Sequence, residues 1–248
     1  MEPQLAVIIP AFNEARRLTD NLLTVLSYLE TFRPDAELIV VDDGSTDGTA
    51  EIAKDLFAHR PDVCARVLRF DTNHGKGHAV RAGLFAARAP IALFSDADLS
   101  TPITELPKIV DPIAAGNYDI VFGSRALDRT LIGQRQPWRR EQGGKVFNLV
   151  VRLTTSLSFS DTQCGFKAFR MQTVRPVLAE AQIDGFGFDV ELLFLAQRAG
   201  LRLLEVPVRW DHHEGSKVSI VRDSLRMFGE VMSLRRRAGR EETAAGSR

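Results

Sequence analysis

The sequence has few cysteines, no long apolar run and no excess of charge of either sign. Its 248 residues include two cysteines, Cys64 and Cys164, which lie far apart in the chain. This spacing excludes a framework of disulfides and a CxxC metal motif, so we expect two reduced thiols. Basic and acidic residues number 32 each. The net charge therefore gives no sign of a nucleic-acid partner, and we expect none.

Membrane-spanning and secretory signals are also missing from the sequence. No stretch approaches the roughly 20 apolar residues of a transmembrane helix. The first residues, Met1 to Gln4, lack the basic and apolar regions of a signal peptide. We therefore expect a cytoplasmic protein that is either free or bound at the surface of a membrane.

Two common phosphate-binding motifs are absent as well. The glycine-rich segment Asn73–His78 matches neither GxxxxGK[ST] nor GxGxxG, and no other predicted strand end carries GxGxxG. Its absence argues against a nicotinamide-dependent dehydrogenase. Gly75 and Gly77 at the start of a predicted helix still allow the backbone to approach a ligand, and helix N-termini favour anions.

What the first half of the chain does contain is an alternation of apolar runs and amphipathic helix patterns. Runs that are apolar on both faces are typical of parallel strands covered by helices. The pattern predicts a doubly wound α/β fold with a mostly parallel sheet. The predicted strands are 5–9, 37–41, 67–68, 91–94 and 119–122, and the predicted helices are 14–32, 47–59 and 78–88.

The second half follows a different pattern. We expect a polar, basic stretch over 127–144, helices over 145–157 and 188–198, a loop over 160–169 and a strand over 205–210. Pro207 indicates that this last strand lies at a sheet edge. We expect one domain over residues 1–215, an amphipathic basic helix over 216–237 and a disordered tail over 238–248.

Polar residues follow the predicted strands where ligands bind in such sheets. Asp96 and Asp98 come after the run 91–94, and two carboxylates at this spacing can bind one hard cation such as Mg²⁺ or Mn²⁺. The alternative is a solvated acidic turn. Because the other strand ends also carry polar clusters, we favour a metal or nucleotide site.

Short acids follow the second predicted strand. Asp42, Asp43 and Ser45 suit hydrogen bonds to a ribose or a base, and the alternative is an Asx-type turn that caps the next helix. Asp42 is the better candidate for a ligand contact. Asp189 and Glu191 lie on an apolar helix at a spacing of two, which puts them on different faces. We therefore expect at most one of them to face the site.

Several motifs together resemble family 2 glycosyltransferases with the GT-A fold. The family marks are Ile9-Pro-Ala-Phe-Asn-Glu14, Val41-Asp-Asp-Gly-Ser45 and Asp96-Ala-Asp98. Within this family, the segments Asp161–Lys167, Phe188–Leu193 and Glu214–Lys217 resemble dolichyl-phosphate β-glucosyltransferases more than the related mannosyltransferases. Ser100 stands where those mannosyltransferases have a metal-binding Gln.

The resemblance implies an inverting transfer of glucose from UDP-glucose to a polyprenyl phosphate such as dolichyl or undecaprenyl phosphate. It implies a metal ion, Mg²⁺ or Mn²⁺, at Asp96 and Asp98, of which Asp98 is catalytic. It places the nucleotide-sugar against residues from most of these motifs, which are Pro10, Phe12, Asn13, Glu14, Asp42, Gly75, Lys76, Asp96, Ala97, Gln163 and Asp189.

The resemblance also places the acceptor phosphate at two arginines. Arg125 follows the fifth predicted strand, and Arg139 lies in the basic stretch 135–140. A planar guanidinium can hold a phosphate with two donors. For Arg139 the alternative is a solvated basic loop. The helix 216–237 has one apolar face flanked by arginines, so it either lies in a membrane interface or packs on the sheet.

Three other functions remain open at this stage. The chain could be a polyprenyl-phosphate mannosyltransferase that uses GDP-mannose, or a family 2 transferase with a soluble acceptor. A function of another class is a catalytically silent nucleotide-binding module that regulates a partner. The presence of both Asp96 and Asp98 argues against a silent module.

Overall fold

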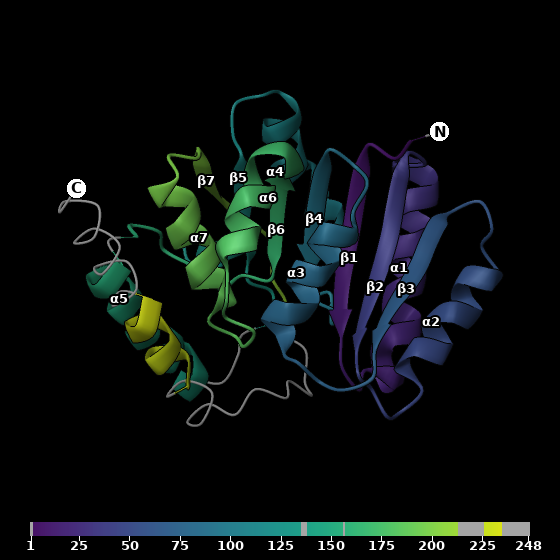
Figure 1. Cartoon of the computed structure of the whole chain (residues 1–248), viewed down its shortest axis with the longest axis horizontal. Coiled ribbons are helices and arrows are strands. Elements are labelled where there is room, and N and C mark those ends of the chain that lie inside the picture. Colours follow the sequence, from purple (N-terminus) through teal and green to yellow (C-terminus); the bar gives the residue numbers. More distant parts are fainter. Residues whose placement is uncertain (1, 135–137, 156, 213–225, 235–248) are drawn as a thin grey trace.

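The computed structural model describes the chain except residues 1, 135–137, 156, 213–225 and 235–248. In one helix the side chains of 138–141, 144–147 and 150 also lie outside the description. The described residues form a seven-stranded sheet with helices on both faces (Figure 1). The doubly wound α/β prediction is confirmed.

The sheet has the strand order β3-β2-β1-β4-β6-β5-β7. β6 is antiparallel to both of its neighbours, and the other pairs are parallel. The strands are β1 (Leu5–Ala11), β2 (Ala36–Asp43), β3 (Cys64–Phe70), β4 (Ile91–Ser95), β5 (Ile120–Ser124), β6 (Phe166–Arg170) and β7 (Leu203–Pro207).

Helices connect these strands, and α3, α6 and α7 lie on the face of the sheet that is toward the viewer in Figure 1. Two short 3₁₀ helices, η1 (Ile103–Glu105) and η2 (Arg129–Leu131), lie in the connections, and residues 226–234 form a further helix. The α-helices are α1 (Ala15–Phe32), α2 (Thr49–Ala58), α3 (Lys76–Ala86), α4 (Leu106–Ala114), α5 (Trp138–Thr155), α6 (Met171–Glu180) and α7 (Phe188–Arg198).

Two apolar cores lie on opposite faces of the sheet. In β1, Ala6 and Ile8 pack into one core while Leu5, Val7 and Ile9 pack into the other. This alternation follows from the strand geometry, in which successive side chains point to opposite faces. Because both faces are covered, β1 and β2 are buried along almost their whole length, and their polar residues gather at the strand ends.

The prediction of a loop over 160–169 is wrong in its second part. Residues 166–170 form β6, a buried strand between β4 and β5. Lys167 in the middle of this segment concealed the strand, because a charged residue interrupts the apolar pattern. It is fully buried, and its ammonium donates to the carboxylate of Asp189 and the carbonyl of Cys164, both at 2.6 Å.

The predicted bounds of two later elements are also wrong. The last strand covers 203–207 rather than 205–210, although it does lie at the sheet edge that Pro207 indicates. The helix expected to begin at residue 145 begins at Trp138, inside the polar and basic stretch.

Candidate active site

A cavity of about 490 Å³ opens at the carboxyl ends of the first four strands. Its wall also includes Gly185 and Phe186 before α7, and Arg226, Met227 and Glu230 of helix 226–234. Most residues predicted to bind the nucleotide-sugar or the metal line this cavity, which are Pro10, Phe12, Glu14, Gly75, Lys76, Asp96, Ala97 and Asp98.

The turn after β4 presents Asp96 and Asp98 to the cavity. The Asp96 amide donates to the carbonyl of Gly165 at 3.0 Å, and the Ser100 amide donates to Oδ1 of Asp98 at 3.0 Å. A Cβ at Gly165 would collide with the Asp96 carboxylate, so any side chain here would displace that carboxylate. From α1, Asn21 donates to the carbonyl of Ala97 at 2.7 Å. These contacts fix the position of both aspartates.

A partly buried ion pair lies at the base of this turn. Nζ of Lys76 lies 2.6 Å from Oδ1 of Asp96 and 5.9 Å from the ring centroids of Phe94 and Phe188. Burial alone would lower the pKa of Lys76, but Asp96 and Asp189 outweigh it and the pKa is raised. Burial raises the pKa of Asp96, opposed by Lys76 and reinforced by Asp98. The ammonium of Lys76 thus lies near the carboxylates of Asp96, Asp98 and Asp189.

The donor set here fits a magnesium or manganese ion that is shared with a ligand. Among the described residues, no three His, Cys, Asp or Glu side chains form a metal-binding group. Mg²⁺ and Mn²⁺ prefer oxygen ligands, and Mg²⁺ usually uses one or two carboxylates together with substrate phosphates and water. Asp96 and Asp98 supply two carboxylates in a cavity large enough for a diphosphate.

Arg17 also lines the cavity, although it belongs to none of the sequence motifs. Its guanidinium donates from Nε to Oε2 of Glu14 and from Nη2 to Oε1 at 3.0 Å. Nη1 lies 3.9 Å from Oδ2 of Asp98, is buried, and has no hydrogen-bond partner among the described residues. Arginine in the first turn of a helix opposes the helix dipole, which is a signal that could have identified it.

At the end of β2 the cavity is lined by Asp43 rather than Asp42. Asp43 accepts hydrogen bonds from the amides of His74 at 3.0 Å and Gly75 at 2.7 Å, and from the side chain of Asn73 at 2.9 Å. Asp42 is fully buried and lies 3.4 Å from Nε of Arg69. Successive strand residues point to opposite faces, so only one of the two acids can face the cavity.

Asn13 supports the rim without lining the cavity. Its backbone has φ of 54°, its amide donates to Oγ of Ser45 at 2.8 Å, and its Oδ1 accepts from the amide of Thr46 at 2.8 Å. The side chain therefore joins the ends of β1 and β2. Asparagine tolerates this left-handed backbone better than most residues.

Arg125 follows β5, and its guanidinium is held by the carboxylate of Asp161. Its Nε and Nη2 donate to the two oxygens of Asp161 at 2.6 and 2.8 Å, and its amide donates to the same carboxylate at 3.0 Å. Its guanidinium also lies 5.7 Å from the ring centroid of Trp210. Although burial raises the pKa of the Asp161 carboxyl, the adjacent Arg125 guanidinium outweighs this effect and lowers it to about 2. The two-pronged contact predicted for a phosphate is therefore occupied by Asp161.

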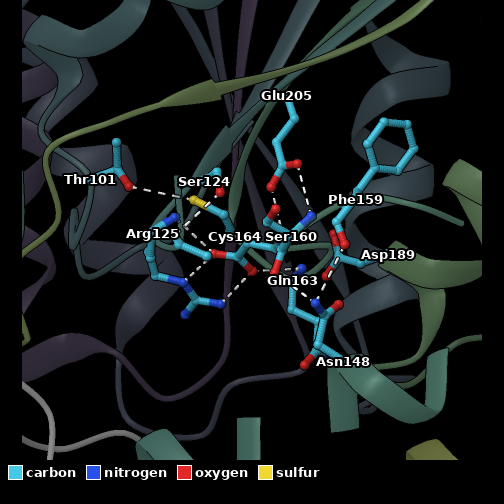
Figure 2. Close-up of polar contacts among 12 residues, drawn as sticks. Thr101, Ser124, Arg125, Asn148, Phe159, Ser160, Gln163, Cys164, Asp189 and Glu205 are labelled. Atoms are coloured by element: carbon cyan, nitrogen blue, oxygen red, sulfur yellow. Dashed lines mark hydrogen bonds and ion pairs between the residues drawn. The ribbon is translucent and has the colours of Figure 1, made fainter. Parts of the chain in front are cut away.

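The loop that carries Asp161 is held by β7 and by α5 (Figure 2). Glu205 of β7 accepts from the amides of Ser160 and Asp161 at 2.8 and 2.7 Å. Asn148 of α5 donates to the carbonyl of Ser160 at 2.6 Å. The position of Arg125 thus depends on β7, α5 and this loop together.

Gln163, Asp189 and Arg139 differ from the other predicted site residues. Gln163 donates to Sδ of Met227 at 3.1 Å, and neither it nor Asp189 lines the cavity. Asp189 is buried and paired with Lys167, and Glu191 accepts from the amides of Gln182 and Ile183, so neither helix acid faces the site. Arg139 lies in α5, and its side chain is outside the described residues.

The sequence from residue 6 to 177 matches the family model described as glycosyl transferase family 2. The chain belongs to this family. It is 33% identical over 241 residues to a dolichyl-phosphate beta-glucosyltransferase of Dictyostelium discoideum, which covers 93% of this chain and 73% of the relative. It is 38% identical over 229 residues to the enzyme of the same name from Drosophila melanogaster. This match covers 87% of this chain and 69% of the relative.

A further relative is matched over only part of its own length. Glycosyltransferase AglD of Haloferax volcanii is 35% identical over 231 residues, which cover 92% of this chain and 36% of that protein. The chain therefore spans about a third of AglD. No helix among the described residues of the transferase is long and apolar enough to cross a membrane.

Solved structures with low sequence identity share the GT-A fold. Glucosyl-3-phosphoglycerate synthase of Mycobacterium tuberculosis, in complex with Mn²⁺, UDP and glucosyl-3-phosphoglycerate, superposes with a TM-score of 0.69 at 22% identity, covering 94% of this chain and 78% of that one. Mannosyltransferase PcManGT of Pyrobaculum calidifontis superposes with a TM-score of 0.59 at 21% sequence identity. The superposition covers 88% of this chain and 59% of that one. The transferase thus has the predicted fold.

Proposed function

We propose that the transferase moves glucose from UDP-glucose to a polyprenyl phosphate and forms a β-linked product. The observation that carries this proposal is the agreement between sequence and site. Relatives 32–38% identical over most of the chain are named dolichyl-phosphate beta-glucosyltransferases. The cavity that faces Asp96 and Asp98 suits a nucleotide diphosphate with a divalent cation.

The chemistry requires little of the protein beyond positioning and charge. A phosphate monoester is largely dianionic at neutral pH, because its second pKa is about 6, so its oxygen can attack the anomeric carbon directly. The bond from that carbon to the diphosphate breaks as the new bond forms, and the configuration inverts. No general base is needed. Asp189, which lies on α7, is paired with Lys167 and is not available as a base.

Each side chain at the site then has a defined task. Asp96 and Asp98 would hold a Mg²⁺ or Mn²⁺ ion, which stabilises the departing diphosphate when it is bound. Arg125, fixed by Asp161, presents its remaining guanidinium edge to the acceptor phosphate. Arg139 remains our second candidate for that phosphate.

We place the transferase at the cytoplasmic face of a membrane, where the lipid acceptor resides. On α5, Leu149 and Leu153 are 56% and 72% exposed, and on helix 226–234 Phe228 is 45% exposed. Arg152 is exposed on α5 next to Leu153. Exposed apolar side chains beside cations suit an interface with anionic lipids.

Calorimetry with UDP in the presence and absence of Mn²⁺ tests the donor half of this proposal. We expect binding that requires the metal and is lost in Asp98→Ala, because the diphosphate then lacks its counter-ion. UDP binding that is unchanged in EDTA and in Asp98→Ala would contradict the metal role. A screen of nucleotide-sugars with extracted polyprenyl phosphate, read by mass spectrometry of the lipid, then identifies the donor.

A further inference from the structure

Helix 226–234 contributes to the cavity wall with three residues. Arg226, Met227 and Glu230 line the same cavity as Asp96 and Asp98. The sequence suggested that this region either lies in a membrane interface or packs on the sheet. In the described part, Met227 and Val231 belong to the apolar core that also contains side chains of α3, α6 and α7. One face of this helix is therefore committed to the protein.

The carboxylate of Glu230 attaches the helix to the turn before α7. Its Oε2 accepts the hydrogen bond of the Gly187 amide at 3.0 Å, and its side chain is 17% exposed. Gly187 is the N-cap residue of α7. A carboxylate at a helix N-terminus is favoured by the helix dipole and by the unpaired amides there.

Two glycines make room for this carboxylate. A Cβ on Gly185 would lie 2.6 Å from Oε1 of Glu230, and a Cβ on Gly187 would lie 2.5 Å from Oε2. Gly187 has φ of −76°, a conformation that any residue adopts, so its backbone does not require glycine. A side chain at this position would instead displace the carboxylate of Glu230.

Glu230 also orients a cation at the cavity. Nε of Arg226 lies 3.2 Å from Oε1 of Glu230, one helical turn away. A second contact comes from the loop of Asp161, because Gln163 donates to Sδ of Met227 at 3.1 Å. The helix is thus joined to the turn before α7 and to the loop that fixes Arg125.

We propose that helix 226–234 is a wall of the donor-binding site, attached by Glu230 to the amide of Gly187, with Arg226 directed at an anionic ligand in the cavity. This inference rests on the proposed function, since it assigns the cavity to a nucleotide-sugar. Glu230 is a positioning residue: it acts through the placement of the helix and of Arg226.

Two substitutions remove the contact from opposite sides, and a third is a matched control. Gly187→Ala adds the Cβ that meets Glu230, and Glu230→Ala removes the carboxylate. Gly229→Ala introduces the same methyl group in the helix itself, where nothing lies within 4 Å of the added Cβ. The variants are compared as full-length chains by calorimetry with UDP and Mn²⁺, and by hydrogen exchange of the peptide that covers 226–234.

We expect Gly187→Ala and Glu230→Ala to bind UDP about tenfold more weakly or worse, since each loses a hydrogen bond to a charged group. The amides of 226–234 should exchange faster in both variants, while those of β1 and β4 stay protected, which shows that the fold is intact. Gly229→Ala should match the wild type in affinity, and its helix amides should exchange no faster than those of the wild type, because alanine favours a helix more than glycine.

Unchanged UDP affinity in both Gly187→Ala and Glu230→Ala would overturn the inference, and the proposed function would stand if the wild type bound UDP with Mn²⁺. If the wild type itself bound no UDP, the proposed function would be wrong. The assignment of helix 226–234 to the donor-binding site would then be wrong as well.

Discussion

Nζ of Lys76 lies 2.6 Å from Oδ1 of Asp96, so the carboxylate that we expect to bind a metal already has a positive partner. The lysine is at the first position of α3, directly after Gly75. Without Lys76, the acids Asp96, Asp98 and Asp189 would lie near one another with one fewer cation. The ion pair is therefore as much a stability feature as a part of the site.

Lys76→Met should lower the free energy of unfolding of the metal-free protein by roughly 1–3 kcal/mol, because a partly buried carboxylate loses its partner. Mn²⁺ should restore part of the loss, since a cation at Asp96 and Asp98 replaces the missing charge. Urea unfolding with Mn²⁺ or EDTA measures both effects. Lys54 is exposed, so Lys54→Met serves as the control. Equal free energies of unfolding in the Lys76 and Lys54 variants would contradict this account.

Arg17 should matter for metal binding more than for folding. Its buried Nη1 faces Asp98 at 3.9 Å, and we expect it to hold that carboxylate in place. Arg17→Gln should weaken Mn²⁺ binding in the presence of UDP by about threefold to tenfold, and Arg17→Lys by less, because lysine keeps the charge. Electron paramagnetic resonance of free Mn²⁺ provides the affinity. Arg16 is exposed, so Arg16→Gln serves as the control. Equal Mn²⁺ affinities in all three variants would exclude Arg17 from this role.

The Arg125–Asp161 pair predicts a dependence of stability on acid. The pKa of Asp161 in the folded protein is about 2, below its ordinary value of 3.8. A depressed pKa contributes stability above the unfolded value, and this contribution is lost as the pH falls from about 4 to 2. The difference in unfolding free energy between wild type and Asp161→Asn should be about 2 kcal/mol near neutral pH and should shrink over that interval. A difference that stays constant down to pH 2 would show that the pair does not titrate in this way.

Arg125 should act on the acceptor and not on the donor. A charge-assisted contact to phosphate is worth roughly 1.5–3 kcal/mol, so Arg125→Ala should lower kcat/KM for a short, water-soluble prenyl phosphate by about tenfold to a hundredfold. UDP affinity with Mn²⁺ should change little. Arg139→Ala is measured on the same short acceptor. A loss of kcat/KM there indicates that Arg139 binds the acceptor phosphate, and unchanged kinetics indicate that it only attracts anionic lipid. Unchanged kinetics in Arg125→Ala would remove it from the acceptor site.

The sequence predicted those parts of the molecule that follow a regular pattern. The parallel strands and the turn with Asp96 and Asp98 could be located, because apolar runs end where polar residues begin. β6 could not, because the buried Lys167 is stabilised by Asp189 on α7, a partner distant in sequence. α4 and α6 contain Pro112 and Pro176, which conceal a helix pattern.

The candidate site was likewise predictable from the sequence only in part. Asp43 and Asp42 are adjacent in the sequence, and only the pleat of β2 determines which of them faces the cavity. The contact of Glu230 with Gly187 joins segments 43 residues apart. Neither relation has a local signal, since each depends on how distant elements pack.

The central claim is a transfer of glucose to a lipid phosphate, and mass spectrometry of the lipid product tests it most directly. The purified full-length protein is incubated with Mn²⁺, a polyprenyl phosphate and either UDP-glucose or GDP-mannose, and kcat/KM is measured for each donor. We expect a lipid carrying one hexose from UDP-glucose, formed with the higher kcat/KM and not formed by Asp98→Ala. A higher kcat/KM with GDP-mannose, or no hexosyl lipid from UDP-glucose while a soluble acceptor is glycosylated, would contradict the account.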